Sequence, residues 1–181
     1  MVIAVIDPTS RGDGGAAVLR AAGVDVEVGI LAGEARLVLN PWLTAIKHSR
    51  PTVTAAYLAH AGAGTDEAIR GRALTELRTS VDAVLHPDGT VEEGVTGSHG
   101  QGVLNLPTTP VTGAPPDVLT ELYTAGVRSL LLVGDAPLVK TYAGLGLVDR
   151  ALAFLPQPDE PAEREPMWAG IRLPPASVSN A

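Results

Sequence analysis

The chain has 181 residues, of which 45% are hydrophobic and only 3% aromatic, and it carries a formal net charge of −7. This composition predicts a globular protein with no nucleic-acid partner, because phosphate backbones need cations and single strands need aromatic stacking surfaces. The absence of cysteine excludes disulfides, thiolate metal ligands and a thiol nucleophile. No apolar run approaches membrane-spanning length and no basic leader precedes the first apolar run, so we expect a cytoplasmic protein without a membrane partner.

The first thirty residues read as a βαβ unit. Residues 2–6 form a short apolar run that predicts a strand, 16–22 predict a helix, and 24–28 alternate apolar and acidic side chains as a second strand does. A helix is expected at 32–39. Pro41 is expected to interrupt it before residues 42–46, because proline lacks the amide that a helix interior needs.

After Pro51 the sequence alternates between strand and helix patterns, which predicts an α/β sheet. We expect one loop-rich stretch at 87–116, with a weak strand candidate at 102–106, and a proline-rich, charged segment at 157–166. The strands are expected at 52–58, 82–85, 128–133, 150–155 and 167–173, and the helices at 65–79, 117–125 and 136–145.

Metal and nucleophilic sites find little support in the residue pattern. The four histidines have no ligand spacing, so no zinc or other metal is expected. Ser98 stands beside His99 in a glycine-rich loop without a nucleophile elbow. Glu92 and Glu93 are a general acid/base pair or, more commonly for adjacent acids, solvated side chains. No catalytic residue is therefore assigned.

Two glycine-containing turns are candidates for contact with a cofactor phosphate. Gly89 and Thr90 follow the strand at 82–85 in an Asp-Gly-Thr sequence, which is a phosphate-facing loop or an ordinary Asp-Gly turn. Gly134 and Asp135 lie between a strand and a helix, where α/β proteins hold phosphate. Asp135 is a degenerate residue for that role, because its carboxylate repels an anion and can cap the helix instead.

Collinear segments resemble the bifunctional deaminase-reductase family of riboflavin biosynthesis, from the end of its deaminase domain through its reductase domain. The segments with the most specific match are Ile3-Ala4-Val5-Ile6-Asp7-Pro8 and residues 19–31, followed by Glu34-Ala35-Arg36 and Asn40. Weaker ones are Arg50-Pro51-Thr52-Val53-Thr54, Leu77-Arg78, Asp82-Ala83-Val84-Leu85, Gly89-Thr90-Val91, Leu130-Leu131-Leu132, Gly134, Ala136, Leu138 and Ala143-Gly144-Leu145.

The resemblance implies an α/β, dihydrofolate-reductase-like fold with a deaminase-like βαβ remnant and linker helix at 1–48 and a reductase-like domain at 49–181. It also implies NADPH as hydride donor, a small pyrimidine or nucleotide ligand, and a homodimer. The family's zinc-binding deaminase motifs are missing, so deaminase activity is not expected. The cofactor contacts that survive are Gly89, Thr90 and Gly134, with Asp135 at a degenerate position.

Several family positions carry different residues here. The lysine of the first reductase strand falls at Ala56, and the following acid-containing turn falls at residues 60–63, where Gly62 stands in place of the acid. The Glu-Gly-Gly of the later strand becomes Val133-Gly134-Asp135. These departures leave two hypotheses: a divergent NADPH-dependent reductase, or a non-catalytic pseudo-reductase that serves as a binding or assembly module.

Replacing Asp135 tests the cofactor hypothesis directly. Asp135→Gly removes a charge that opposes a diphosphate, so NADPH affinity measured by calorimetry should rise, while the lost cap should lower stability by up to about 1 kcal/mol. Turnover should remain absent, because the lysine and the acid of the family are missing. Tight NADPH binding by the unmodified protein would contradict this expectation.

Overall fold

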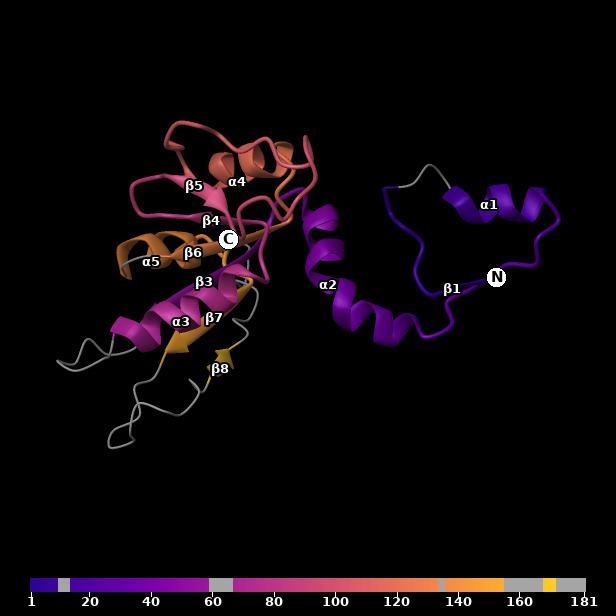
Figure 1. Cartoon of the computed structure of the whole chain (residues 1–181), viewed down its shortest axis with the longest axis horizontal. Helices are drawn as coiled ribbons and strands as arrows, with labels where there is room; N and C mark the ends of the chain where they lie inside the picture. The colour runs from indigo at the N-terminus through magenta and orange to yellow at the C-terminus, as the bar shows by residue number, and fades with distance from the viewer. Residues whose placement is uncertain (10–13, 59–66, 134–135, 155–167, 172–181) are drawn as a thin grey trace, which may run out of the picture. The chain divides into compact units, whose positions relative to one another are not determined.

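The computed structural model describes residues 1–9, 14–58, 67–133, 136–154 and 168–171. The chain divides into two compact units, Met1–Ser49 and Arg50–Ala181, each taken separately below (Figure 1). That the first unit is a deaminase remnant stays a prediction. Within the described residues, no helix is long and apolar enough to cross a bilayer.

The N-terminal unit contains the expected βαβ arrangement. Strand β1 (Val2–Ile3) and strand β2 (Glu27–Val28) pair in parallel, and helix α1 (Gly14–Ala21) connects them. The ladder consists of Val2 opposite Glu27 and Ile3 opposite Val28, so both strands are shorter than the sequence pattern predicts. A two-stranded ladder of this length leaves most of the predicted strand residues without a sheet partner.

Helix α2 (Ala32–His48) continues through Pro41, so the predicted interruption is wrong. Both Pro41 and Leu37 are exposed, and water can therefore hydrogen-bond the carbonyl oxygen that a proline leaves unpaired. The helix is bounded by two residues in the left-handed conformation, Leu31 (φ 56°) and Ser49 (φ 52°). The Ser49 amide closes the carboxyl end by donating to the carbonyls of Ala45 and Ile46.

The second unit is built on a six-stranded sheet with the order β5-β4-β6-β3-β7-β8. The four inner strands are parallel, and the two edge strands pair antiparallel to their neighbours. This arrangement confirms the predicted α/β class. The strands are β3 (Thr52–Leu58), β4 (Ala83–Leu85), β5 (Val91–Glu93), β6 (Ser129–Val133), β7 (Arg150–Phe154) and β8 (Trp168–Ile171).

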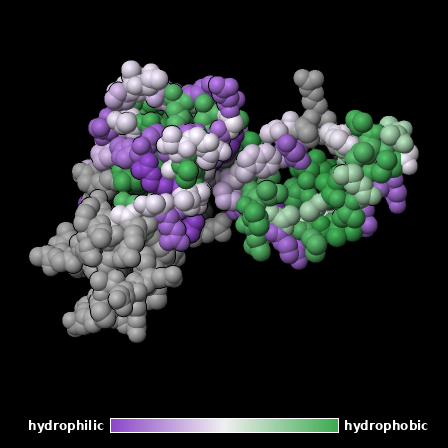
Figure 2. Space-filling view, viewed as in Figure 1, coloured by the Kyte–Doolittle hydropathy of each residue, from purple (hydrophilic) through white to green (hydrophobic). Residues whose placement is uncertain are grey.

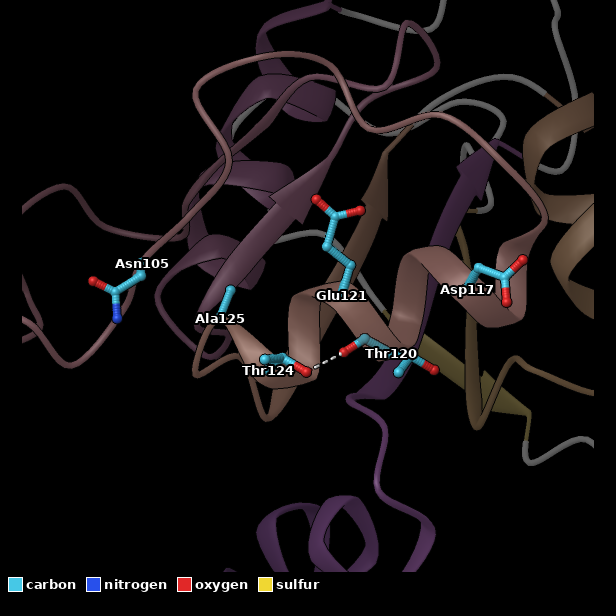
Figure 3. Close-up of a pocket in the computed structure, with 6 residues that line it drawn as sticks. All are labelled: Asn105, Asp117, Thr120, Glu121, Thr124 and Ala125. Carbon is cyan, nitrogen blue, oxygen red and sulfur yellow. Dashed lines mark hydrogen bonds between the residues drawn. The ribbon is translucent and has the colours of Figure 1, made fainter.

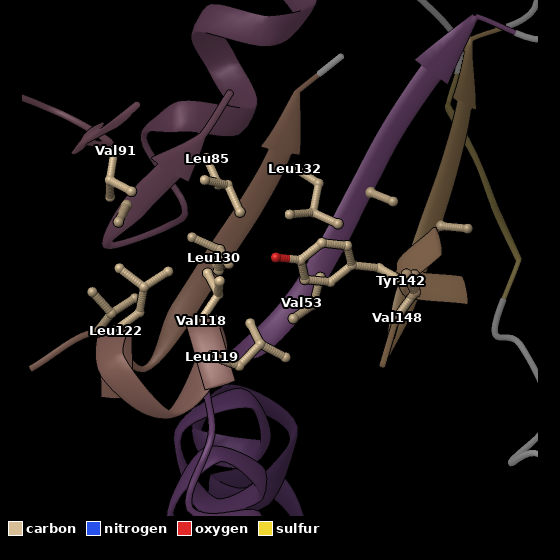
Figure 4. Packing of buried hydrophobic residues seen from close by; sticks show 14 residues of the cluster. Val53, Leu85, Val91, Val118, Leu119, Leu122, Leu130, Leu132, Tyr142 and Val148 are labelled. Carbon is tan, nitrogen blue, oxygen red and sulfur yellow. The ribbon is translucent and has the colours of Figure 1, made fainter. Parts of the chain in front are cut away.

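Helices cover both faces of this sheet. Side chains alternate along β6, so Leu130 and Leu132 join one apolar cluster and Leu131 joins the other. The first cluster packs against helices α4 (Pro115–Thr124) and α5 (Ala136–Gly144), and the second against helix α3 (Glu67–Arg78). Figure 4 shows the larger cluster, in which the Tyr142 ring lies among aliphatic side chains of α4 and the sheet. Burial among apolar side chains raises the pKa of Tyr142.

The long loop-rich stretch contains one strand that the sequence pattern does not predict and lacks one that it does. Strand β5 pairs with β4 as a short hairpin, although its Val-Glu-Glu sequence has no strand signal. The weak strand candidate at 102–106 is wrong, because these residues form a turn and an irregular segment. Leu104 and Leu106 instead pack against the core from outside the sheet, and the Asn105 amide donates to the Ala125 carbonyl at 2.8 Å.

Two carboxylates hold the amino-terminal edge of the sheet. Asp149, just before β7, accepts from the Val53 amide at 2.8 Å and forms a two-point ion pair with Arg50, with N–O distances of 2.6 and 2.8 Å. Asp82, just before β4, accepts from the Arg128 and Ser129 amides at 2.8 Å each. Each carboxylate therefore joins the start of its own strand to the start of the parallel neighbour.

Asp149→Ala should be strongly destabilising. The substitution leaves the partly buried Arg50 guanidinium and the Val53 amide without their partner, so we expect a loss of about 2–4 kcal/mol in the free energy of unfolding. Chemical denaturation of the full chain followed by circular dichroism measures this. Asp117→Ala, at an exposed position of α4, is the matched control and should change stability by no more than about 0.5 kcal/mol. Equal effects of the two variants would show that the Asp149 bridge does not anchor the sheet.

Candidate functional site

The carboxyl-terminal edge of the parallel strands is where the fold can hold a ligand. In open α/β sheets, ligands bind outside these strand ends, in the loops that follow them. Register places Leu85 of β4 beside Leu132 of β6, and Val133 of β6 beside Ala56 of β3. The loop that contains Gly89 and Thr90 therefore leaves the sheet next to the end of β6. Gly134 and Asp135 follow β6 but lie outside the described residues, as does the segment 59–66 after β3.

The loop 86–90 closes on itself. The His86 amide donates to the Thr90 carbonyl at 3.0 Å, and the Gly89 amide donates to the His86 carbonyl at 3.0 Å. The Thr90 amide donates to the Asp88 carboxylate at 2.9 Å. This is the Asp-Gly turn of a β-hairpin, and three of its backbone donors are already used. A phosphate held by this loop would have to replace these hydrogen bonds.

The backbone conformation and the packing at position 89 both require glycine. Its φ of +84° belongs to the left-handed region, and a Cβ at this position would lie 2.4 Å from the Val111 carbonyl oxygen. The Gly89 carbonyl also accepts from the Val111 amide at 2.9 Å. The turn is therefore joined to the segment at residues 110–111, and the glycine serves this close approach of two backbones.

The side chains on this loop form an open hollow. It has a volume of about 460 Å³ and is lined by His86, Pro87, Asp88, Thr90 and Glu92. Hydrogen bonds from the Thr90 amide and side chain lower the pKa of the exposed Asp88 carboxyl. Asp88 is therefore an anion at neutral pH, and it stands in the turn that a cofactor phosphate would have to approach.

A charged cluster that sequence reasoning did not identify adjoins this hollow. The Glu92 carboxylate lies 2.7 Å from His86 Nε2 and 2.7 Å from Arg78 Nη2. The hydrogen bond with His86 lowers the pKa of the Glu92 carboxyl, Arg78 lowers it further, and desolvation acts in the opposite direction. A β-hairpin around the Asp-Gly turn would have revealed this cluster. Pairing of Leu85 with Val91 brings His86 and Glu92 together across the turn.

Glu92 and Glu93 do not form a general acid/base pair. Neighbouring residues of a strand point to opposite faces of a sheet, and the two carboxylates accordingly have different partners. Glu93 accepts from the Gly97 amide at 2.6 Å and lies 3.3 Å from His99 Nδ1. Both side chains are partly exposed and are bonded to neighbouring residues. This arrangement is nearer to the second prediction, that of solvated acids, than to a catalytic pair.

Ser98 and His99 lie at the opposite, amino-terminal edge of the sheet. The Ser98 hydroxyl is 3.1 Å from His99 Nδ1, and His99 Nε2 is 3.2 Å from Asp82 Oδ1. The serine is exposed, and the Glu93 carboxylate contacts the same His99 Nδ1 atom as the Ser98 hydroxyl. The hydroxyl therefore competes with a carboxylate for the ring nitrogen that would have to take its proton. The contacts tie the segment after β5 to Asp82, which is a structural role.

A second hollow, of about 570 Å³, lies along the outer surface of α4 (Figure 3). Its two threonine hydroxyls donate to helix carbonyls four residues earlier, Thr120 to Pro116 and Thr124 to Thr120 at 2.9 Å each. The charged groups that line this hollow are the carboxylates of Asp117 and Glu121, which disfavour an anionic ligand. Among the described residues, no cluster of three or more histidine or acidic side chains is arranged to hold a metal ion.

Three solved structures are similar to this chain. One is a diaminohydroxyphosphoribosylaminopyrimidine deaminase/5-amino-6-(5-phosphoribosylamino)uracil reductase from Thermotoga maritima, with a TM-score of 0.58 and 18% identity over 85% of this chain and 58% of that protein. The others are two forms of RibD from Acinetobacter baumannii, both with a TM-score of 0.58, at 18% and 17% identity over 91% of this chain. This chain spans 58 to 63% of the length of these proteins.

No protein-family model matches the chain, and no curated protein matches it in sequence. The structural similarity confirms the predicted α/β, dihydrofolate-reductase-like fold and agrees with the resemblance found in the sequence. At the position where that resemblance places a lysine, the structure has the methyl side chain of Ala56, 8% exposed between Val133 and Leu152.

The dependence of the free energy of unfolding on pH in the acid range should reveal the contribution of Glu92 and its contacts with His86 and Arg78. A carboxyl whose pKa is lowered on folding contributes stability above its ordinary value of 4.5 and loses that contribution as pH falls through the lowered pKa. Glu92→Gln should therefore be less stable than wild type near neutral pH, by no more than about 1 kcal/mol because Glu92 is part-exposed. The difference should shrink below pH ~4.5 in denaturation curves.

Glu121→Gln, on the outer surface of α4, is the matched control for that experiment and should follow the wild-type profile at every pH. A difference between wild type and Glu92→Gln that stays constant down to strong acid would show that the ion pair does not stabilise the fold.

Proposed function

We propose that this chain is a divergent, reductase-like protein that has lost reductase activity and acts as a binding or assembly module on the dihydrofolate-reductase-like fold. Its relationship is to the pyrimidine reductase of riboflavin biosynthesis, and its expected ligand is a small pyrimidine or nucleotide. The observation that carries the proposal is the closed turn at residues 86–90, in which the amides of His86, Gly89 and Thr90 are hydrogen-bonded within the turn and Asp88 is an anion.

Charge supports this proposal. A phosphorylated cofactor or sugar is held by arginine or lysine side chains and by free backbone amides. The hollow at residues 86–92 offers the carboxylates of Asp88 and Glu92, and the adjoining guanidinium of Arg78 is already paired with Glu92. An arrangement in which the cation is neutralised by an internal partner has little attraction left for phosphate.

The centre of the sheet edge supports the proposal as well. Ala56 lies on β3 between the ends of β6 and β7, where register brings three strands together. Its buried methyl group can neither bind a phosphate nor move a proton. A residue that was to replace the family lysine would have to come from another strand or loop at this edge.

The second candidate function is an active NADPH-dependent reductase. The observation in its favour is that similarity to the deaminase/reductase structures extends over 85 to 91% of this chain. Under this hypothesis hydride would pass from NADPH to a pyrimidine ligand at the carboxyl-terminal edge, with catalytic residues from its loops.

Ligand-dependent stability separates the two functions. A ligand that binds only the folded state stabilises it by about 4 kcal/mol at a thousandfold excess over its dissociation constant, which raises the melting temperature by several degrees. We expect no change in melting temperature with millimolar NADPH or NADP⁺ and no heat of binding in calorimetry. A reductase of the same fold is the positive control. Stabilisation by NADPH together with its oxidation by a ribosylaminopyrimidine would instead establish the enzyme.

A further inference from the structure

Helix α4 carries a hollow that the proposed function does not use. This α4 hollow, of about 570 Å³, extends along the outer surface of the helix from Asp117 to the capping residue Ala125 (Figure 3). Asn105, from the segment before α4, also lines it, and the Asn105 amide donates to the Ala125 carbonyl at 2.8 Å. All the lining residues belong to the second unit, and none of them lines the hollow at residues 86–92.

The described residues that line the α4 hollow offer hydrogen-bond acceptors but no positive charge. The hydroxyls of Thr120 and Thr124 donate their protons to helix carbonyls, so only their lone pairs remain for a ligand. Arg128 follows the helix but does not line the hollow. Its guanidinium donates to the Tyr123 carbonyl at 2.7 Å and lies 3.9 Å from the centre of the Tyr123 ring. A ligand of the α4 hollow therefore has to supply donors.

The carboxylates of Asp117 and Glu121 have no hydrogen-bond or ion-pair partner among the residues that the structure describes. In this they differ from Glu92 and Asp149, whose carboxylates are paired with arginines of the same unit. Asp117 and Glu121 are four residues apart in α4, the spacing at which like charges on one helix face repel each other. A cation bound between them would relieve this repulsion.

We propose that the α4 hollow is a docking site for a basic segment of another protein, with an arginine side chain of that segment between Asp117 and Glu121. A guanidinium has five donors in one plane and no acceptor, which matches two carboxylates that only accept. The aliphatic stem of the arginine can pack on the methyl groups of Thr120, Thr124 and Ala125. This proposal goes beyond the proposed function, because it involves neither the loop at 86–90 nor NADPH.

The size of the α4 hollow and its one amide side chain favour a peptide over a small free cation. The helix advances by about 10 Å from Asp117 to Thr124, which is long enough for several residues of an extended chain. The exposed Asn105 side chain has both donors and an acceptor, as a peptide main chain does.

The surface and charge of the second unit also favour a basic partner. On the face that Figure 2 shows, hydrophilic side chains are interspersed with hydrophobic ones over the described residues of this unit. A partner that relies on apolar contact alone therefore finds no broad patch on that face. Residues 50–181 include fifteen acidic and nine basic side chains, a formal net charge of −6, which attracts a basic segment before contact.

The test measures binding of two synthetic peptides to the full chain. One is a short peptide with two arginines, and the other has neutral citrulline in their place. Calorimetry at low ionic strength should detect binding of the arginine peptide alone. Asp117→Asn/Glu121→Gln should weaken this binding by at least about tenfold, equivalent to about 1.4 kcal/mol. The circular dichroism spectrum should not change, because neither carboxylate is bonded within the described fold.

Asp25→Asn/Glu76→Gln is the matched control. It removes the same two charges from exposed positions outside the α4 hollow and should bind the arginine peptide as wild type does. The amide resonances that shift on binding should be those of Asn105 and residues 117–125. Equal weakening in both variants, or equal binding of the citrulline peptide, would overturn the proposal. So would the absence of binding, or binding of spermidine at the same residues with equal affinity, which would identify a site for small cations.

Discussion

The sheet of the second unit depends on carboxylates that accept backbone amides across parallel strands. Parallel strands have no connecting turn to set their register, because a helix intervenes between them. Asp149 fixes β7 against β3 through the Val53 amide, and Asp82 fixes β4 against β6 through the amides of Arg128 and Ser129. A one-residue slip in either pair would break these bonds and turn the buried side chains of β6 toward the wrong face.

The residues that set strand register lie at the opposite edge of the sheet from the loops in which α/β folds hold ligands. Carboxylates at the amino-terminal edge set strand register, and none of them lies among the loops where the fold holds ligands. The side chains at the carboxyl-terminal edge can therefore change without loss of the sheet, as Ala56 shows by lying in an intact β3. The chain accordingly shares a fold with solved structures to which it is only 17 to 18% identical.

The features that could be read from the sequence are those that depend on local pattern. The apolar run at 128–133 predicts a buried central strand, and β6 has three fully buried leucines. Pro41 and β5 could not be predicted, because solvent around α2 and pairing with β4 override local propensity. At the candidate site, Gly89 and Thr90 lie where the pattern places them, but the contact of Gly89 with Val111 and the ion pair of Glu92 with Arg78 join segments that are distant in the sequence.

The contact between Gly89 and Val111 limits how this protein could change its chemistry. The turn and the segment at 110–111 are joined by a backbone hydrogen bond, and a side chain at position 89 would collide with the Val111 carbonyl oxygen, so any substitution of Gly89 has to displace one of the two backbones. Removing the Asp88 side chain would free the Thr90 amide but leave the hydrogen bond between the Val111 amide and the Gly89 carbonyl in place. A turn that offers its amides to an anion would therefore need a different backbone path at residues 110–111 as well as a different side chain at position 88.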